Sequence, residues 1–366
     1  MKIYLHDLIG IHSGVHYYLD TFANKLIKYD IDTLIFSNYK VKSDNAYYPN
    51  IFQGWIFKRI LLLVISYIKF LIAIIRLKKN EIIIVSLYGT YVDLGLLLIS
   101  KISKNKVLLD VHEIVDDNRE GLTLSILFKY AFRLCNNKII AHSEKVVDNL
   151  KLSGFNNRII FTPHINYEVC SNFNLSNVGT EIKYTFQKGF IYFLFFGNII
   201  PSKGIFDLLS TIEKIDFNNS HAKIIIAGKD RLNNIKNYPK YKEISQKSFL
   251  ILRHINDDEM KYLFSKSNYV LLPYKDISQS GVLEMAINFR KPILSSGIKY
   301  FKDKFQKYPS FGEILSTHDS NSFAREIEYK AKFFNQTKYF IEDDLEKYFN
   351  PNIFKDFIIE IKKLFK

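Results

Sequence analysis

Short apolar runs alternate with helical patterns twice along the chain, and this alternation limits its fold more than any other feature. The first series of runs lies at 2–6, 32–36, 81–85, 106–111, 138–142 and 158–162. The second series lies at 190–197, 221–228, 248–254, 269–274 and 291–296. Strands of a parallel sheet are buried on both faces and are joined by crossover helices, so each series predicts one such sheet. A length of 366 residues suits two domains of this kind.

A polar stretch from about Tyr167 to Lys188 separates the two series, and we interpret it as an interdomain linker. We therefore predict a first Rossmann-like, doubly wound α/β domain at 1–170 and a second at 189–345. The remaining residues, 346–366, contain an amphipathic helix that begins near Pro351. Ligands of such sheets bind beyond the carboxyl ends of the strands, so functional residues are expected in the loops that follow them.

Local signals set several helix ends. Ser143 is a predicted N-cap, and Gly154 is the predicted C-cap residue of the same helix. Asn256 and Glu259 have the spacing of a capping box after the strand at 248–254.

The charge balance narrows the class of partner. The chain has 51 Lys and Arg against 37 Asp and Glu, a formal net charge of +14. Such a surface suits nucleic acid, anionic lipid headgroups or a phosphorylated substrate. No RNA-binding signature, zinc-finger spacing or arginine-rich arm is present, so we expect no nucleic-acid partner. Two cysteines cannot form a disulfide framework, and the first residues carry no signal-peptide pattern, so we expect a cytoplasmic protein.

The first candidate site follows the strand at 190–197. Gly197 permits close approach of a ligand to the backbone, and Lys203 and Gly204 begin a helix whose free N–H groups favour an anion. Asn198 lies in the same turn. The alternative is an ordinary turn with a surface lysine.

The second candidate site follows the strand at 269–274. Asp276 and Glu284 are eight residues apart, and Ser280, Gly281 and Val282 begin the helix between them. Their backbone N–H groups would point at an anion from the first helical turn. Glu284, one turn deeper, is placed to accept hydrogen bonds from sugar hydroxyls.

These residues resemble the retaining glycosyltransferases of the GT-B fold, above all glycosyltransferase family 4. That family has two carboxylates eight apart, a glycine before the second, and a Gly-Lys-Pro turn, which 290–292 match as Arg-Lys-Pro. Its phosphate motif corresponds to Gly197, Asn198, Lys203 and Gly204, with asparagine where arginine is common. Asp276, which replaces a glutamate, has a shorter reach to the sugar.

The resemblance implies two domains facing one another across a cleft, with the last helix crossing back to the first domain. It implies transfer of a hexose from a UDP- or GDP-linked sugar to a glycan or lipid-linked acceptor in bacterial surface polysaccharide synthesis, with retention of configuration. Neither a cofactor nor a metal is required. Lys203, Asn198, Gly197, Glu284 and the N–H groups of 280–282 would bind the donor, and Asp276 would act on the sugar. Two rivals remain: a sugar-nucleotide epimerase of the same fold, and a non-catalytic binding subunit.

In the first half, Gly14 lies in a glycine-bearing turn that faces the donor in the family, although the turn lacks the dinucleotide fingerprint. His112 follows directly from a buried strand and matches a family histidine close to the transferred sugar, which makes it a catalytic candidate. The alternative is a structural histidine that holds a loop carbonyl.

The segment 55–79 is an apolar helix with basic residues. At about 100° per residue, Lys58, Lys69 and Arg76 fall on one narrow stripe. This pattern suits a helix in the interface of an anionic membrane, and it also suits a helix packed on the first sheet with one wet edge. We expect contact with the inner face of the cytoplasmic membrane.

Overall fold

The computed structural model divides the chain into two units. Unit 1 comprises Met1–Tyr167 and Pro351–Lys366, and unit 2 comprises Glu168–Asn350. The described residues are 1–9, 16–39, 46–103, 106–112, 122–135, 137–152, 154–155, 159–162, 167, 169–230, 232–277, 280–336, 338–350 and 352–364.

The sheet of unit 1 is parallel throughout, with strand order β2-β1-β3-β4-β5-β6. Its strands are β1 (Lys2–Asp7), β2 (Asp32–Ser37), β3 (Glu81–Leu87), β4 (Val107–Val111), β5 (Ile139–Ala141) and β6 (Ile159–Phe161). Each corresponds to a predicted apolar run. The strands are parallel, so the residues that follow β1, β3, β4 and β5 share one edge of the sheet.

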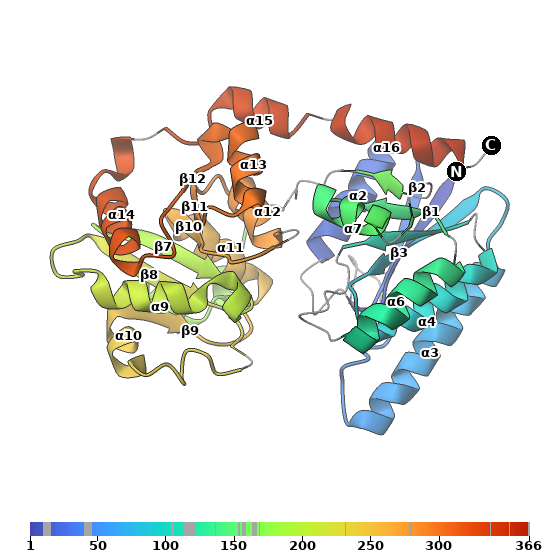
Figure 1. Ribbon diagram of the computed structural model, residues 1–366, viewed down its shortest axis with the longest axis horizontal. Coiled ribbons are helices and arrows are strands. Elements are labelled where there is room, and N and C mark those ends of the chain that lie inside the picture. The colour runs from blue at the N-terminus through green and yellow to red at the C-terminus, as the bar shows by residue number, and fades with distance from the viewer. Residues whose placement is uncertain are drawn as a thin grey trace. The chain divides into compact units, whose positions relative to one another are not determined.

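Helices cover both faces of this sheet (Figure 1). They are α2 (His16–Lys28), α3 (Ile56–Ile75), α4 (Tyr91–Ser100), α6 (Leu122–Cys135), α7 (Glu144–Leu152) and α16 (Asn352–Lys363). Helices α3, α4 and α6 lie side by side, and their buried side chains join those of β3 and β4 in one apolar core. The crossover helices that parallel strands require therefore supply the core as well.

Helix α16, near the end of the sequence, packs on helix α2 of unit 1. The rings of Phe354 and Phe357 in α16 lie 5.7 and 5.6 Å from the ring of Phe22 in α2. All three side chains are buried. The expected return of the C-terminal helix to the first domain is thus confirmed.

Unit 2 repeats the plan with strand order β12-β11-β10-β7-β8-β9, again parallel. Its strands are β7 (Ile191–Phe196), β8 (Ala222–Ala227), β9 (Ser248–Ile251), β10 (Tyr269–Leu272), β11 (Ile293–Ser295) and β12 (Gly312–Ile314). Its helices are α8 (Thr180–Lys183), α9 (Ile205–Lys214), α10 (Tyr241–Lys247), α11 (Asp257–Lys266), α12 (Gly281–Asn288), α13 (Lys299–Lys307), α14 (Ser320–Lys332) and α15 (Glu342–Tyr348). The short strand β12 was not predicted, because it has three residues and no apolar run.

The structure confirms the helix ends that the capping residues predict. Ser143 Oγ accepts from the backbone N–H of Val146 at 3.3 Å, and Gly154 has a left-handed φ of 89°. Asn256 and Glu259 form the complete capping box of α11.

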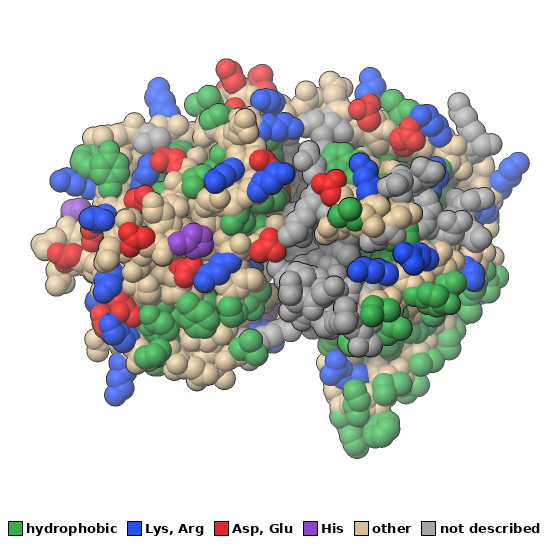
Figure 2. Space-filling view, in the orientation of Figure 1, with side chains coloured by type: hydrophobic (Ala, Val, Ile, Leu, Met, Phe, Trp, Pro, Cys, Tyr) green, Lys and Arg blue, Asp and Glu red, His purple; other side chains and the backbone are tan. Residues whose placement is uncertain are grey.

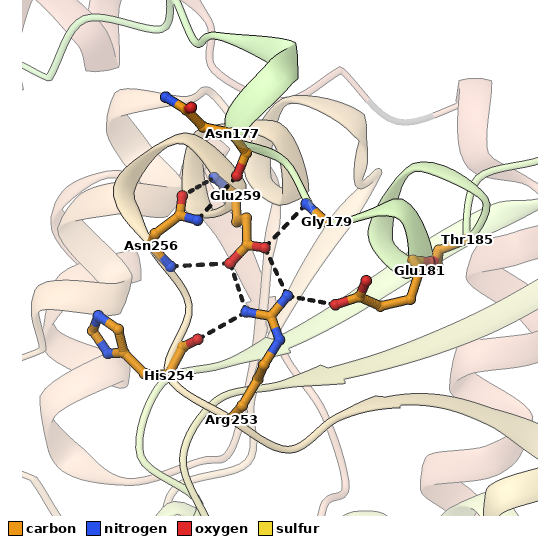
Figure 3. Close-up of polar contacts among 8 residues, drawn as sticks. All are labelled: Asn177, Gly179, Glu181, Thr185, Arg253, His254, Asn256 and Glu259. Carbon is orange, nitrogen blue, oxygen red and sulfur yellow. Dashed lines mark hydrogen bonds and ion pairs between the residues drawn. The ribbon is translucent and has the colours of Figure 1, made fainter.

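The polar stretch interpreted as a linker is instead fixed to unit 2 over most of its length. The guanidinium of Arg253 donates to both carboxylate oxygens of Glu259 at 2.6 and 2.7 Å and to Glu181 at 2.5 Å (Figure 3). Glu259 also accepts from the backbone N–H of Gly179, and Asn256 donates to the carbonyl of Asn177. Because backbone groups as well as side chains are bonded, residues 177–181 form part of unit 2. The sequence pattern gave no sign of these contacts, because the partners are 72 to 80 residues apart.

Helix α3 buries one face and exposes the other. Ser66, Phe70 and Ile74 are buried, and the hydroxyl of Tyr67 donates to the carbonyl of Val92, in the first turn of α4, at 2.7 Å. Lys69, expected on an outer basic stripe, donates from Nζ to the carbonyl of Tyr47 at 2.6 Å. The stripe is therefore broken at its centre. In the described part of the chain, no helix is long and apolar enough to cross a membrane.

Candidate anion and sugar site

The turn after β7 is shaped by a close backbone approach. Residues Pro201–Lys203 form one 3₁₀ turn, and Gly204 follows with a φ of 72° before α9 begins. A Cβ atom on Gly204 would lie 1.8 Å from the carbonyl oxygen of Pro273. Only glycine fits this position, and the turn is thereby held against the segment after β10. The backbone N–H of Lys275, which donates to Ser202 O at 2.8 Å, fixes the same contact.

The two predicted loops of unit 2 meet at Gly197. A Cβ atom on Gly197 would lie 3.1 Å from Lys203 Nζ and 3.5 Å from Val282 Cγ2. The ammonium of Lys203 also lies 5.5 Å from the ring centroid of Tyr274. The structure therefore brings Gly197, Lys203 and Val282 together. Tyr274 was not singled out in the sequence, where its only signal is its place at the end of a strand.

The surroundings of Lys203 favour an anion. Loss of water around the half-buried side chain lowers its pKa to about 8. Asp207 on α9 pairs with Lys275 and His318. Within the described residues, no ion pair includes Lys203. An anion beside Nζ would supply the missing opposite charge. The side chain is half-buried, and its role in holding an anion stays a prediction.

Helix α12 begins at the same place. Ser280 is its N-cap, and its Oγ accepts from the backbone N–H of Leu283 at 3.1 Å. The N–H groups of Gly281 and Val282 precede any intrahelical acceptor, and they carry the positive end of the helix dipole. Gly281 is exposed and Val282 half-buried, whereas Ser280 is buried. The cap therefore satisfies the N–H of the third residue of the helix. The helix starts beside Lys203, because Val282 Cγ2 and Lys203 Nζ both lie next to Gly197.

The two carboxylates that are eight residues apart have different surroundings. Asp276 is exposed on the loop after β10. Glu284 is 2% exposed; its Oε2 accepts a hydrogen bond from the Tyr348 hydroxyl, and its Oε1 lies 3.7 Å from Lys304 Nζ. Sequence reasoning missed Tyr348 and Lys304, which come from α15 and α13. Asn198 is exposed beside Gly197, and Gly14 lies outside the described residues.

His112 lies in unit 1, directly after β4, and is 7% exposed. Its ring stacks on Tyr88 and on His142, with centroids 5.4 and 5.3 Å apart. Its Nε2 lies 3.3 Å from Oδ2 of Asp110, the residue two positions earlier on β4. Asp110 was not singled out in the sequence, because an acid within an apolar run gives no sign of its partners.

Comparisons with known proteins bear on the family of unit 2 and on the fold. The model of the family described as Glycosyl transferases group 1 matches residues 180–333, within unit 2. The matched segment contains Lys203, the start of α12 and Glu284. No sequence among the curated proteins matches the chain.

Solved structures match nearly the whole chain. Sucrose-phosphate synthase from Thermosynechococcus elongatus is 12% identical, with a TM-score of 0.70 over 100% of this chain and 98% of that one. HepE from Anabaena, solved with UDP and glucose, is 14% identical, with a TM-score of 0.65 over 99% and 100%. WaaG, a glycosyltransferase involved in lipopolysaccharide biosynthesis, is 10% identical, with a TM-score of 0.63 over 98% and 99%. At these identities the likeness concerns the fold. The chain thus has the GT-B fold and is a glycosyltransferase, and its second unit carries the glycosyl transferases group 1 domain.

Proposed function

We propose that the chain transfers a hexose from a UDP- or GDP-linked sugar to a glycan or lipid-linked acceptor of a bacterial surface polysaccharide. The observation that carries this proposal is the meeting of Lys203, Gly197 and the start of α12 around one point. HepE, which shares the fold, is solved with UDP and glucose, and WaaG acts in lipopolysaccharide synthesis. Both support a nucleotide-linked donor and a surface glycan.

In this mechanism, unit 2 binds the donor. Lys203 and the N–H groups of Gly281 and Val282 hold the diphosphate and stabilise the charge that develops on it as it leaves. The lysine and the helix terminus supply the positive charge, so we propose that no cofactor or metal is needed. Glu284 binds the ribose, and Asp276 binds hydroxyls of the sugar.

His112 contributes from unit 1, on the acceptor side, beside the reacting carbon. With retention of configuration, an oxygen of the departing phosphate accepts the proton of the attacking hydroxyl. The exposed Asn198, next to Gly197, contacts a phosphate of the bound donor.

The decisive experiment begins with a thermal-stability screen of UDP-glucose, UDP-N-acetylglucosamine and GDP-mannose, because a bound donor stabilises the folded state by mass action. The donor that raises the Tm of the wild-type protein is then used in turnover assays with an acceptor extract. Lys203→Ala and Glu284→Ala should each lower kcat/KM about 100-fold. Lys214→Ala, at the exposed end of α9, serves as control.

Three outcomes would overturn parts of the proposal. Unchanged turnover in both variants removes the site assignment. Conversion of the donor without an acceptor, seen by mass, indicates an epimerase. Donor binding without release of nucleoside diphosphate indicates a binding subunit.

We further propose that α3 rests on an anionic membrane surface. Trp55 and Phe57 are 78% and 74% exposed at its start, and the exposed apolar face continues through Ile56, Ile60, Leu61, Val64, Ile68, Ile72 and Ile75. Figure 2 shows these apolar side chains along the free edge of unit 1. Twenty residues extend about 30 Å, and the helix contains no acid.

Charge favours a membrane over a second apolar protein surface. Lys58 and Arg59 are exposed near the start of α3, and Arg76, Lys78 and Lys79 are exposed at its end. An apolar face flanked by cations fits acyl chains beneath anionic headgroups.

Vesicle flotation tests this contact. The protein should float with phosphatidylcholine vesicles that contain phosphatidylglycerol, and less at high salt. Changing Leu61, Val64 and Ile68 together to Gln should abolish flotation, whereas Leu152→Gln, an 87% exposed residue elsewhere in unit 1, should not. If the wild-type protein does not float at low salt, α3 does not bind this membrane. If the wild type is a dimer and the triple variant a monomer, the apolar face of α3 binds a second copy of the chain instead.

A further inference from the structure

Tyr274 follows β10 in unit 2, and its backbone is fixed on three sides. The carbonyl of the residue before it leaves no room for a Cβ on Gly204. The backbone N–H of the residue after it donates to the carbonyl of Ser202 at 2.8 Å, and Ser296 Oγ donates to the carbonyl of Tyr274 itself at 2.5 Å. The turn after β7 and the segment after β11 therefore both determine where the Tyr274 side chain lies.

The side chain of Tyr274 lies against the ammonium of Lys203. Tyr274 is 1% exposed, and the centroid of its ring lies 5.5 Å from Lys203 Nζ. The ring of Phe301, on α13, is its neighbour, with centroids 5.8 Å apart. The face of an aromatic ring carries negative potential and attracts a cation, more strongly where water is excluded. The ring therefore stabilises the ammonium beside Gly197, where a Cβ atom would lie 3.1 Å from Nζ.

The phenol of Tyr274 is neutral. Burial raises the pKa of Tyr274 well above its usual range, and Ser280, which lies near the hydroxyl, opposes this effect only in part. The hydroxyl therefore stays protonated at physiological pH, so the face of the ring and not a negative oxygen attracts Lys203.

Lys203 is a charge that burial disfavours. Loss of water lowers the pKa of its ammonium to about 8. The charged groups on neighbouring elements are Asp207 on α9, and Lys275 and His318, which both pair with Asp207. The face of Tyr274 thus supplies an attraction that, in the described part of the chain, no ion pair gives to Lys203.

We propose that Tyr274 is a positioning residue of the donor site, whose ring holds the ammonium of Lys203 in place for a diphosphate. The alternative is a core tyrosine that only fills space between the loops. The two differ in one consequence, because only an electrostatic contact depends on the electron density of the ring. The inference rests on the proposed function for its effect on donor binding, but the ionisation of Lys203 can be measured without turnover.

The first test changes the electron density of the ring and leaves its size nearly the same. Tyr274→Phe is compared with a protein that carries 3,4,5-trifluorophenylalanine at the same position, introduced with a suppressor tRNA. Fluorine withdraws electrons from the face of the ring, so the pKa of Lys203 should be lower by about half to one unit in the fluorinated protein. NMR titration of protein labelled with ¹³C at lysine Cε measures this pKa, and the signal lost in Lys203→Arg identifies Lys203.

Controls separate this effect from a change of fold. Phe323→Leu, which alters a buried ring on α14, should leave the pKa of Lys203 unchanged. An equal Lys203 pKa in Tyr274→Phe and in the trifluoro protein would overturn the proposal. If melting curves show that either protein does not fold, 3-fluorotyrosine at position 274 replaces them. It retains the hydroxyl and is compared with the wild type, and it should lower the Lys203 pKa in the same way.

The second test is kinetic and uses the donor that stabilises the wild-type protein. A fall of one unit lowers the protonated fraction of Lys203 at pH 8 from about one half to about one tenth, so KM for the donor should rise about fivefold. At pH 6 both rings leave the lysine charged, and the two KM values should agree. In a Lys203→Arg background, fluorination should not change the pH dependence, because a guanidinium does not titrate in this range. Equal pH effects in the two backgrounds would overturn the proposal.

This inference and the proposed function can fail separately. An inactive wild type in which the Lys203 pKa responds to fluorination of the ring counts against the proposed function alone. An active enzyme in which the Lys203 pKa does not respond counts against the role of Tyr274 alone.

Discussion

The hydroxyl of Tyr348 donates a hydrogen bond to the carboxylate of Glu284, across 64 residues of sequence and between helices α15 and α12. Both side chains are buried, at 3% and 2% exposed. Burial, and then the negative charge of Glu284, raises the pKa of the phenol well above its usual range. The hydroxyl therefore remains a donor at every physiological pH, and it fixes the carboxylate that we propose binds the ribose.

Tyr348→Phe should lower stability and weaken donor binding together. Loss of a hydrogen bond to a buried charged group costs about 1.5–3 kcal/mol, and the freed carboxylate loses its fixed orientation. We expect a lower Tm and a several-fold higher KM for the donor. Tyr329→Phe, at a 57% exposed position, is the matched control. An unchanged Tm would mean that the bond contributes nothing to the fold.

Donor turnover should fall as pH rises through about 8, because the pKa of Lys203 is lowered to about 8 and only the protonated form binds a diphosphate. The profile of kcat/KM against pH measures this limb. Lys203→Arg keeps the charge and does not titrate in this range, so its profile should lack the limb. A limb that persists in Lys203→Arg would assign it to another group.

Lys203→Met should be more stable than the wild type at neutral pH, although inactive. Burial lowers the pKa of Lys203 from 10.5 to about 8, so the ammonium destabilises the folded state below pH 8. The free energy of unfolding of the wild type should therefore rise as the pH increases from about 8 to 10.5. Chemical denaturation at pH 7 and pH 10 measures the difference. Lys214→Met should leave the stability at both pH values unchanged. A Lys203→Met variant that is less stable than the wild type at pH 7 would contradict the prediction.

Gly204→Ala should destabilise unit 2 by about 1–3 kcal/mol or more, because a Cβ would lie 1.8 Å from Pro273 O at a φ of 72°. Gly189→Ala is the matched control, with a φ of 87° and no atom within 4 Å of the added Cβ. It should show the backbone strain alone. Equal Tm values for the two variants would mean that the contact with Pro273 yields without cost.

Arg253→Ala should loosen the segment around Gly179. Burial would raise the pKa of Glu259, but Arg253 and backbone N–H groups lower it below 4.5. The ionised Glu259 therefore stabilises the fold fully above pH 4.5, and this contribution is lost as the pH falls below that value. We expect a lower Tm at pH 7, a smaller difference at pH 3.5, and faster proteolysis near 179. Arg325→Ala, on the exposed face of α14, should behave as the wild type. A difference that grows in acid would contradict this account.

The sequence predicted the strands well because buried parallel strands are apolar runs, and the turn after β7 because Gly197, Lys203 and Gly204 are close in sequence. It could not predict the direction of Lys69, which is decided by the carbonyl of Tyr47 on another segment. Nor could it find Tyr348, whose partner comes from a different helix. Contacts between distant segments follow from packing, which one sequence does not display.

The place of α16 in unit 1 bears on how the chain is made. A ribosome completes every residue of unit 2 before it releases the helix that covers Phe22, so unit 2 can fold during synthesis. Unit 1 keeps an apolar surface uncovered until α16 has been synthesised. Premature termination anywhere after Asn350 would therefore harm the half of the protein that was synthesised first.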